Sequence, residues 1–271
     1  MDTTLGKIKQ FSDDQYSNEK RLNARIQIYK FCEKKLNWRE WIFDKLDFRD
    51  VTQILELGCG NGLLWKDNID RVPENIHVVL TDLSKGMVDS ARINLKKYQR
   101  RFGFLASDAS RTPFADNTFQ MIIANHMLYY FENKQKIFTE IDRLLTDDGF
   151  AYASTISTSN FKELIDIVAV FDKNLEFENV QTVRSFNLAN GECVLSSHFN
   201  ISDIFIYQND IIVNNTAPVI LYLASCYSPE QLDILKSKYI DFKKYLESVI
   251  KETGAIRITN KNVLFKFRKK R

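Results

Sequence analysis

The chain has 271 residues, of which 44% are hydrophobic, and its 38 basic residues nearly balance 35 acidic ones. This length and apolar content suffice for one sizeable core, while the even charge balance argues against general attraction to nucleic acid. Four widely spaced cysteines match neither a zinc site nor a disulfide framework, so a cytoplasmic protein is expected. The longest apolar run, near residues 219–226, is too short to span a bilayer, and the N-terminus lacks a signal-peptide pattern.

Two amphipathic helices are predicted at the N-terminus. Apolar residues recur at helical spacing from about residue 15 to residue 36. Asn37 can cap a second helix, which carries the aromatic residues Trp38 and Trp41. The simplest interpretation is that both helices pack on the main domain.

The most informative stretch is a strand followed by a cluster of glycines. The apolar run over residues 53–57 predicts a buried strand, and residues 58–62 read Gly-Cys-Gly-Asn-Gly. Glycine has no Cβ and tolerates positive φ, so such a turn lets the backbone approach a ligand. With a helix expected from Leu63, the stretch predicts a cradle for a nucleotide-type ligand. The spacing is not that of a dinucleotide-binding turn, and no Gly-Lys-Ser/Thr phosphate loop is present; the alternative is a glycine cluster without a ligand.

Polar residues follow three further predicted strands, over residues 77–82, 102–106 and 120–124. Asp82 ends the first of them, where a carboxylate can accept hydrogen bonds from ribose hydroxyls or cap the helix that begins near Ser84. Asp108 follows the second strand and Asn125 follows the third. Because ligands bind at the carboxyl ends of the strands in an open parallel sheet, these side chains are expected at one site.

Together these motifs resemble those of the class I S-adenosylmethionine-dependent methyltransferases. Glu56 fills the acidic position of the family's Glu/Asp-x-Gly-x-Gly-x-Gly motif, and the three glycines of residues 58–62 fill the rest. Residues 113–119 resemble a signature of the type 11 subgroup, which includes the ubiquinone and menaquinone enzymes. Gln120 replaces the usual Asp of that signature, a change that we interpret as structural. Residues 147–149 resemble a relaxed Lys-Pro-Gly-Gly turn, with glycine as the C-cap of the preceding helix.

The resemblance implies an α/β fold, a Rossmann-like, doubly wound sheet of seven strands. The strand order would be 3-2-1-4-5-7-6, with strand 7 antiparallel. Strands are expected over residues 150–155, 203–207, 255–259 and 263–267, and helices over residues 161–170, 188–199, 218–225 and 229–253. We expect a single domain over residues 1–271, made of N-terminal lid helices (1–48), a core (49–208 and 255–271) and a helical cap insertion (209–254).

The resemblance also implies S-adenosyl-L-methionine as the cofactor and S-adenosyl-L-homocysteine as its product. In the family, the acid at Glu56 faces the amino group of the methionine part, the acid at Asp82 binds the ribose, and the acid at Asp108 binds the adenine amino group. Lid residues can also reach the cofactor. The expected cofactor-binding residues are Glu56, Gly58, Cys59, Gly60, Asn61, Gly62, Asp82, Leu83, Met87, Ser107, Asp108, Ala109, Asn125 and Tyr16.

Methyl transfer from a sulfonium leaves no obligatory catalytic signature in a sequence. The protein mainly aligns the nucleophile and excludes water, and it needs a general base only when the nucleophile has a proton to lose early. His126 is the candidate base because imidazole can titrate near neutral pH, and Tyr129 is the next candidate. The alternative for His126 is a polar group that lines the site without proton transfer.

The favoured partner is a small-molecule methyl acceptor. The Asn-Pro-Pro-Tyr motif of enzymes that methylate planar amino groups is absent, and no Pro-Cys follows the strand that ends near residue 124. Oxygen, nitrogen and carbon acceptors stay open, as does the oligomeric state. Two other functions remain: a cofactor-binding regulator or partner subunit without turnover, and an RNA methyltransferase that would use the basic C-terminal tail and the basic residues between 92 and 101.

Overall fold

A computed structural model describes Thr4, residues 19–175 and residues 183–270. Tyr16 lies outside these residues, so its contact with the cofactor stays a prediction. The chain divides into two compact units. Unit 1 consists of Met1–Asn37, Ser159–Gln181 and Gln208–Lys261, and unit 2 consists of Trp38–Thr158, Thr182–Tyr207 and Asn262–Arg271. The predicted roles of residues 1–48 as a lid and 209–254 as a cap stay predictions.

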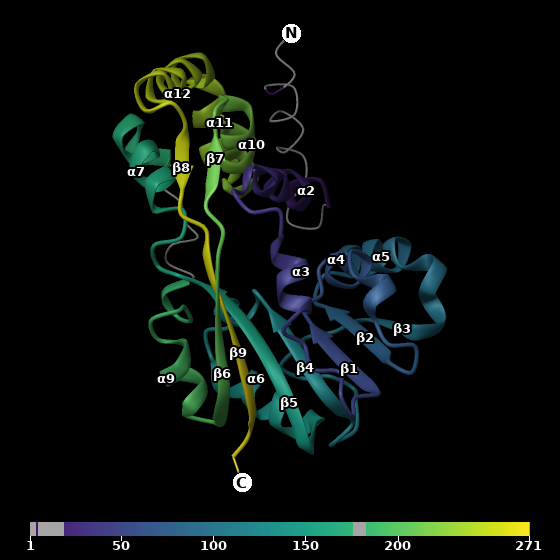
Figure 1. Cartoon of the computed structure of the whole chain (residues 1–271). Helices are drawn as coiled ribbons and strands as arrows, with labels where there is room; N and C mark the ends of the chain where they lie inside the picture. The colour runs from purple at the N-terminus through teal and green to yellow at the C-terminus, as the bar shows by residue number, and fades with distance from the viewer. Residues whose placement is uncertain (1–3, 5–18, 176–182, 271) are drawn as a thin grey trace. The chain divides into compact units, whose positions relative to one another are not determined.

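Unit 2 is built on a seven-stranded sheet with the order β3-β2-β1-β4-β5-β9-β6 (Figure 1). The strands are β1 (Gln53–Leu57), β2 (His77–Asp82), β3 (Phe102–Ala106), β4 (Phe119–Asn125), β5 (Leu145–Ile156), β6 (Phe199–Gln208) and β9 (Lys261–Lys269). β1 pairs in parallel with β2 and β4, whereas β9 pairs antiparallel with β5. The predicted order and the antiparallel seventh strand are therefore confirmed. The carboxyl ends of β1, β2, β3 and β4 lie along one edge of the sheet, because all four strands run in the same direction.

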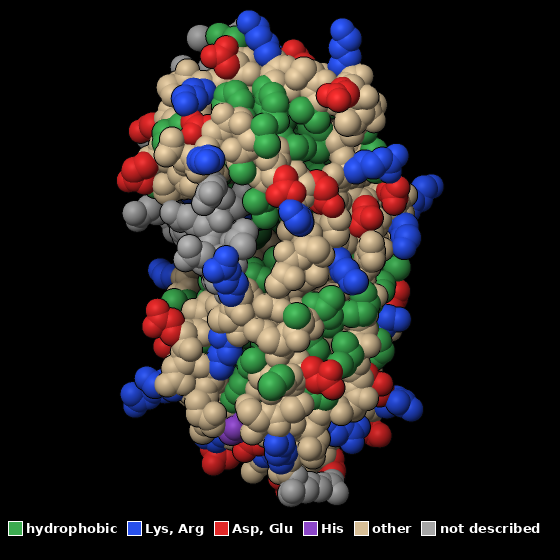
Figure 2. All heavy atoms as spheres, turned by 90° about the vertical axis from the view of Figure 1, so that its left-hand side faces the viewer, with side chains coloured by type: hydrophobic (Ala, Val, Ile, Leu, Met, Phe, Trp, Pro, Cys, Tyr) green, Lys and Arg blue, Asp and Glu red, His purple; other side chains and the backbone are tan. Residues whose placement is uncertain are grey.

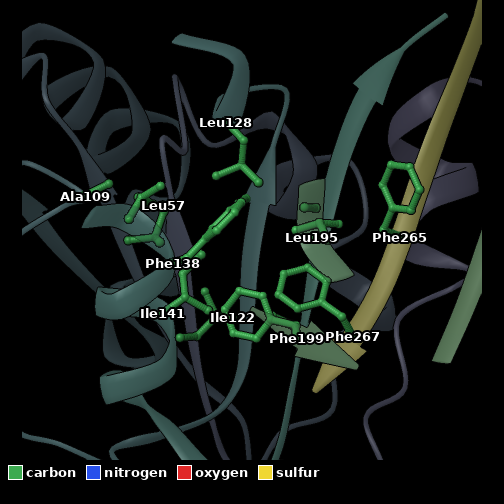
Figure 3. Close-up of a cluster of buried hydrophobic side chains, with 14 of the residues drawn as sticks. Leu57, Ala109, Ile122, Leu128, Phe138, Ile141, Leu195, Phe199, Phe265 and Phe267 are labelled. Carbon is green, nitrogen blue, oxygen red and sulfur yellow. The ribbon is translucent and has the colours of Figure 1, made fainter. Parts of the chain in front are cut away.

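Helices cover both faces of this sheet. They are α3 (Trp38–Phe43), α4 (Leu63–Lys66), α5 (Lys85–Asn94), α6 (Lys134–Leu144) and α9 (Gly191–Ser196), with 3-10 turns η2 (Ile69–Arg71), η3 (Lys96–Arg101) and η4 (Leu128–Tyr130). One buried cluster joins the sheet to α6 and α9, and a second joins it to α3, α4 and α5. In the first cluster, Phe138 and Ile141 of α6 lie near Ile122 of β4, and Phe199 and Phe267 lie beside them (Figure 3).

Unit 1 is mainly helical, with a small two-stranded sheet. Its elements are α2 (Glu19–Gln27), η1 (Ile28–Phe31), α7 (Lys162–Phe171), η5 (Lys173–Leu175), β7 (Ile211–Val213), α10 (Thr216–Cys226), α11 (Pro229–Ser237), α12 (Tyr239–Thr253) and β8 (Ile256–Ile258). β7 and β8 pair antiparallel. The core is rich in aromatic side chains, and the rings of Phe161 and Tyr222 stack with centroids 4.5 Å apart.

Several predicted boundaries in unit 1 and its neighbouring segments were wrong. The single helix expected over residues 229–253 is two helices, because the backbone leaves the helical conformation at Lys238 (φ −104°, ψ 10°). The strands expected over residues 255–259 and 263–267 are both present, as β8 and β9, but β8 pairs with β7 in the small sheet whereas β9 pairs with β5. The helix expected over residues 188–199 is shorter, since α9 covers only Gly191–Ser196, and the last expected residue, Phe199, begins β6.

The turn expected at residues 147–149 is also corrected. α6 ends at Leu144, and the next residues already belong to β5. Gly149 is therefore not a helix C-cap. A Cβ at this position would lie 2.9 Å from Oγ1 of Thr146 and 3.0 Å from the carbonyl oxygen of Thr146. Glycine is therefore needed here because the backbone packs closely against Thr146. Gln120 has the structural role expected of it, because its Oε1 accepts a hydrogen bond from the backbone N–H of Gln53 at the start of β1 (2.8 Å).

Charged side chains are mixed on the surface that Figure 2 presents. Lys and Arg side chains alternate there with Asp and Glu, and hydrophobic side chains lie between them. This face carries no single-sign patch of the kind that attracts nucleic acid. None of the helices in the described residues combines the length and apolar character that crossing a membrane requires.

Candidate functional site

The glycine turn, residues 58–62, follows β1 directly. Its three glycines adopt φ values of 67°, 55° and 72°, which residues with a Cβ rarely adopt. A Cβ on Gly58 would lie 3.1 Å from Cβ of Met127, in the segment after β4. A Cβ on Gly62 would lie 3.1 Å from Cβ of Ala91 on α5. Packing and backbone conformation thus both require glycine. The helix after the turn, α4, has only four residues, so the backbone of the turn itself forms the cradle.

Asp82, at the end of β2, braces this turn. Its Oδ2 accepts a hydrogen bond from the backbone N–H of Gly60 (2.9 Å), and its Oδ1 accepts one from the backbone N–H of Ser84 (2.8 Å). Each carboxylate oxygen still has a lone pair for another donor. The cap of α5 is not Asp82 but Ser84, whose Oγ accepts from the backbone N–H of Met87. Asp82 is therefore free to accept hydrogen bonds from a ligand while it fixes the turn.

Glu56, on β1, is a carboxyl group in the protein interior. Only 2% of its surface is exposed, and its Oε2 accepts a hydrogen bond from Nε1 of Trp65 at 2.7 Å. Burial raises the pKa of Glu56 to about 8; the bond from Trp65 opposes this rise and the nearby Asp82 adds to it. A cation beside Glu56 would favour its ionised form. The residue therefore fits a site that receives a ligand ammonium group.

Asn61 carries a buried donor that lacks an acceptor. The side chain is 4% exposed, and among the described residues its Nδ2 has no hydrogen-bond partner. Leaving such a donor unpaired costs about 1–3 kcal/mol, so the group fits a site where a ligand supplies the acceptor. Its neighbour Cys59 contributes through the backbone, since its N–H donates to the carbonyl of Thr81 (2.8 Å). Burial raises the pKa of the Cys59 thiol well above its usual value, which keeps it neutral.

The segment after β3 presents an exposed carboxylate. The backbone N–H of Ser107 donates to the carbonyl of Asp82 (3.0 Å), which joins this segment to the end of β2. Asp108 is exposed, and its Oδ1 accepts bonds from the N–H and the hydroxyl of Ser110, both at 2.8 Å. Ala109 is buried in the cluster that contains α6. The Asp108 carboxylate thus keeps acceptor capacity at the surface beside Asp82.

Leu83 and Met87 lie at the start of α5, next to Asp82 in the sequence. Leu83 is 79% exposed, although its side chain is large and apolar. Met87 is half-buried and belongs to neither of the two buried clusters of unit 2. An apolar ligand ring that covers these side chains would remove apolar surface from water, which is favourable. Their predicted place beside adenine is compatible with this exposure and stays a prediction.

A second polar group forms at the carboxyl end of β4. Oδ1 of Asn125 accepts hydrogen bonds from Oγ of Ser154 (2.5 Å) and from Nε1 of Trp38 (3.3 Å). Oγ of Ser154, which is buried on β5, in turn accepts the backbone N–H of His126 (2.9 Å). His126 has a φ of 53°, a conformation that costs about 1–3 kcal/mol in a residue other than glycine. Such strain is concentrated at functional sites.

The two catalytic candidates follow Asn125 directly. The ring of His126 lies against that of Trp38, with centroids 5.0 Å apart. Burial lowers the pKa of His126 to about 4, so the ring is neutral at pH 7 but is a weak base. This favours the alternative in which His126 lines the site without proton transfer. Tyr129 lies on η4 with its ring 4.7 Å from that of Tyr130, and its carbonyl accepts a bond from Oγ of Ser185.

The structure thus joins the predicted residues into two hydrogen-bonded groups within unit 2. The first connects the glycine turn, Asp82 and the segment after β3, and the second surrounds Asn125. Three participants were missed from the sequence, namely Trp65, Ser154 and the side chain of Trp38. Ser154 and Trp65 lie in apolar stretches that gave no signal, while Trp38 was noticed only as an aromatic residue on a helix.

Residues 54–149, which hold the glycine turn, β2, β3, β4 and α6, match the family described as a methyltransferase domain. This part of the chain is therefore similar to a methyltransferase domain, and it lies in the seven-stranded sheet of unit 2. Its fold is similar to that of the YcgJ protein from Bacillus subtilis, with a TM-score of 0.57 and 15% identity over 86% of this chain and 98% of that chain. It is also similar to a SAM dependent methyltransferase from Aquifex aeolicus, with a TM-score of 0.51 and 16% identity over 66% of this chain and 90% of that chain. At these identities the likeness establishes the fold.

Two curated relatives are more similar in sequence to this chain than these solved structures are. The malonyl-[acyl-carrier protein] O-methyltransferase of Legionella pneumophila is 24% identical over 160 residues, which is 58% of this chain and 54% of that protein. The enzyme of the same name from Geobacter sulfurreducens is 31% identical over 115 residues, 42% of each chain. The chain thus spans about half the length of these relatives. The finer resemblance to the ubiquinone and menaquinone subgroup stays a prediction.

Proposed function

We propose that this chain binds S-adenosyl-L-methionine at the glycine turn and transfers its methyl group to a small-molecule acceptor. The observation that carries the proposal is the brace between Asp82 and Gly60, which holds a turn of three positive-φ glycines at the carboxyl end of β1. When bound, S-adenosyl-L-methionine supplies a methyl group that its sulfonium has already activated. The family match supports a transferase over a regulatory protein without turnover.

The residues at the turn have chemistry that suits the parts of this cofactor. Glu56 is the acid for the ammonium of the methionine part, because a buried carboxyl is stabilised in its ionised form by a cation. Asp82 keeps lone pairs for the ribose hydroxyls, and the exposed carboxylate of Asp108 is an acceptor for the adenine amino group. The buried Nδ2 of Asn61 finds in the ligand the acceptor that it lacks among the described residues.

For the methyl acceptor we propose an oxygen nucleophile that is ionised before it binds, such as a carboxylate. His126 is a weak base, because burial lowers its pKa to about 4. A carboxylate has no proton to lose at neutral pH, so its methylation requires alignment and the exclusion of water rather than a base. The two curated relatives are O-methyltransferases by name, which supports oxygen as the accepting atom.

Calorimetry with S-adenosyl-L-homocysteine and with NAD tests the cofactor part of the proposal. The protein should bind S-adenosyl-L-homocysteine and ignore NAD. Asp82→Ala should weaken the binding of S-adenosyl-L-homocysteine by about 2–3 kcal/mol, the range for hydrogen bonds to a charged group, or roughly 30- to 150-fold.

The matched control is Asp89→Ala. Asp89 lies on α5 and forms an exposed ion pair with Arg92, so its loss should leave the affinity unchanged. Tight binding of NAD without a response to S-adenosyl-L-homocysteine would contradict the proposal. So would an Asp82→Ala variant that binds as well as the Asp89→Ala control.

A further inference from the structure

We propose that Trp38 and Ser154 are positioning residues that lock the Asn125 carboxamide with its oxygen inward and its two N–H bonds outward. The outward N–H bonds would then hold a carboxylate or carbonyl oxygen of a bound ligand. The lock follows from the geometry alone, whereas the identity of the ligand rests on the proposed function. Neither Trp38 nor Ser154 was expected at the site from the sequence.

Donor chemistry fixes the orientation of the amide. The indole Nε1 of Trp38 can only donate, so the Asn125 atom that it contacts at 3.3 Å must be the oxygen. The backbone N–H of His126 also can only donate, and it occupies Oγ of Ser154 as acceptor. The Ser154 hydroxyl proton is therefore available for Oδ1 of Asn125, at 2.5 Å. A flipped amide would place its nitrogen against the indole N–H of Trp38, which can only donate.

The same hydrogen bonds leave Nδ2 of Asn125 available to donate to a ligand. Among the described residues, Nδ2 of Asn125 has no hydrogen-bond partner, while Oδ1 has two. Asn125 is the last residue of β4, at the sheet edge where parallel strands bind ligands. His126, whose N–H donates to Ser154, has a positive φ, a strained conformation of the kind found at functional sites.

The fixed orientation of the Asn125 amide determines which kind of ligand atom can bind next to it. Two N–H donors of fixed orientation favour an oxygen acceptor and disfavour an ammonium or another donor, which would leave both partners unpaired. The oxygen can come from the carboxylate of the methionine part of the cofactor or from the methyl acceptor. In either case Asn125 contacts the ligand, and Trp38 and Ser154 act through Asn125.

Asn125→Asp is the most direct variant. Aspartate keeps an acceptor oxygen for Trp38 and Ser154, so the fold and the lock are retained, but it replaces the outward donors with an acceptor. The affinity for the ligand whose oxygen faces Asn125 should weaken at least tenfold. Ser154→Ala and Trp38→Phe each remove one of the two locking donors, and each should weaken this affinity about three- to tenfold.

Matched controls are available for both locking residues. Thr155→Val removes the neighbouring buried hydroxyl of β5, which donates to the carbonyl of Phe186 rather than to Asn125. Trp41→Phe alters the ring that stacks on Trp38 at 5.2 Å. A general structural effect would weaken ligand affinity in the two controls as well. The lock instead predicts that ligand affinity changes less than twofold in each control.

The binding arms of the experiment distinguish the two sources of the oxygen. Affinities are measured by calorimetry for S-adenosyl-L-homocysteine and for an analogue without its carboxylate, and KM is measured for short carboxylic acids. If Asn125→Asp weakens only the carboxylate-bearing ligand, the oxygen belongs to the cofactor. If cofactor affinity is unchanged and KM rises at least tenfold with kcat little altered, it belongs to the acceptor. A variant that changes neither parameter overturns the proposal.

A stability measurement tests the lock without any ligand. Denaturant unfolding of Trp38→Phe, Ser154→Ala and the double variant should show non-additive effects, because both residues bind one oxygen atom. The pair Trp41→Phe and Ser154→Ala should be additive. Failure of the wild-type protein to bind S-adenosyl-L-homocysteine would remove the proposed function but leave this cycle intact. Additive effects in the first pair would overturn the lock.

Discussion

Asn209 and Asn260 of unit 1 differ in their hydrogen bonding from the amide side chains at two strand ends of unit 2. In unit 1, Nδ2 of Asn209 donates to the carbonyls of Lys34 (3.0 Å) and Leu36 (3.1 Å), and its Oδ1 accepts the backbone N–H of Lys34 (2.8 Å). Asn260 is also buried and donates to the carbonyl of Asn209 at 3.0 Å. In unit 2, the buried Nδ2 of Asn61 and the Nδ2 of the half-buried Asn125 have no acceptor among the described residues. Unit 2 also holds Asn68, a buried amide whose Nδ2 donates to two backbone carbonyls.

This difference separates a structural amide from one that awaits a ligand. Buried polar groups in native proteins are nearly always hydrogen-bonded, so an unmatched one requires an explanation. Both unmatched amides follow the carboxyl ends of parallel strands, β1 and β4, where such sheets bind ligands. The saturated amides of unit 1 instead join backbone segments that are distant in sequence. Unused amide capacity at these strand ends therefore marks the candidate site.

The largest expected effect comes from Glu56, a buried acid of unit 2. The pKa of Glu56 in the folded protein is about 8, above the ordinary value of 4.5. Between these values the folded protein holds a proton that the unfolded chain has lost, so stability falls as pH rises. The free energy of unfolding should decrease between about pH 5 and pH 8, by at most about 1.4 kcal/mol per pH unit.

Urea unfolding across this pH range measures the effect. Glu56→Gln keeps the acceptor for Trp65 and cannot ionise, so it should flatten the profile relative to the wild-type protein. Saturating S-adenosyl-L-homocysteine should also reduce the slope, because its ammonium group stabilises the ionised carboxyl. An identical slope in the wild-type protein and the Gln variant would show that Glu56 is not the titrating group.

A paired substitution gives the next largest effect and tests the comparison itself. Asn209→Ala removes the part-buried hydrogen bonds to the backbone of Lys34 and Leu36 and should lower the free energy of unfolding by about 1–3 kcal/mol. Its affinity for S-adenosyl-L-homocysteine should stay within twofold of wild type. Asn61→Ala should do the reverse, with affinity about tenfold weaker and stability nearly unchanged, since no bond among the described residues is lost. If both variants lose the same property, the distinction between the two kinds of amide is wrong.

Local sequence was enough to predict what local chemistry determines. The glycine spacing over residues 58–62 predicted a turn after a strand, because glycine readily tolerates these φ values. The bond from Gly60 to Asp82, which braces that turn, was not predicted. The strand order of the sheet was predicted from the resemblance to class I methyltransferases. A helix break at Lys238 could not be predicted, because Leu235, Tyr239 and Phe242 keep helical spacing across it.

Contacts between distant segments are the part that the sequence did not reveal. Trp38 meets Asn125 from 87 residues away, and Ser154 meets it from 29 residues away. No local pattern distinguishes Ser154 from the buried hydroxyl beside it, Thr155, which bonds to a backbone carbonyl. Likewise, the sequence marked His126 as a base by residue type, whereas its low pKa follows from burial that only the folded chain supplies.

Hydrogen exchange with and without S-adenosyl-L-homocysteine tests the central claim most directly, namely that the ligand site lies at the strand ends of unit 2. The account predicts that the ligand slows exchange in four segments, because each would contact the ligand or be braced by a residue that does. These segments are residues 58–62, 82–87, 107–109 and 125–127. Unchanged exchange in these four segments, with protection gained elsewhere in the chain, would contradict the account.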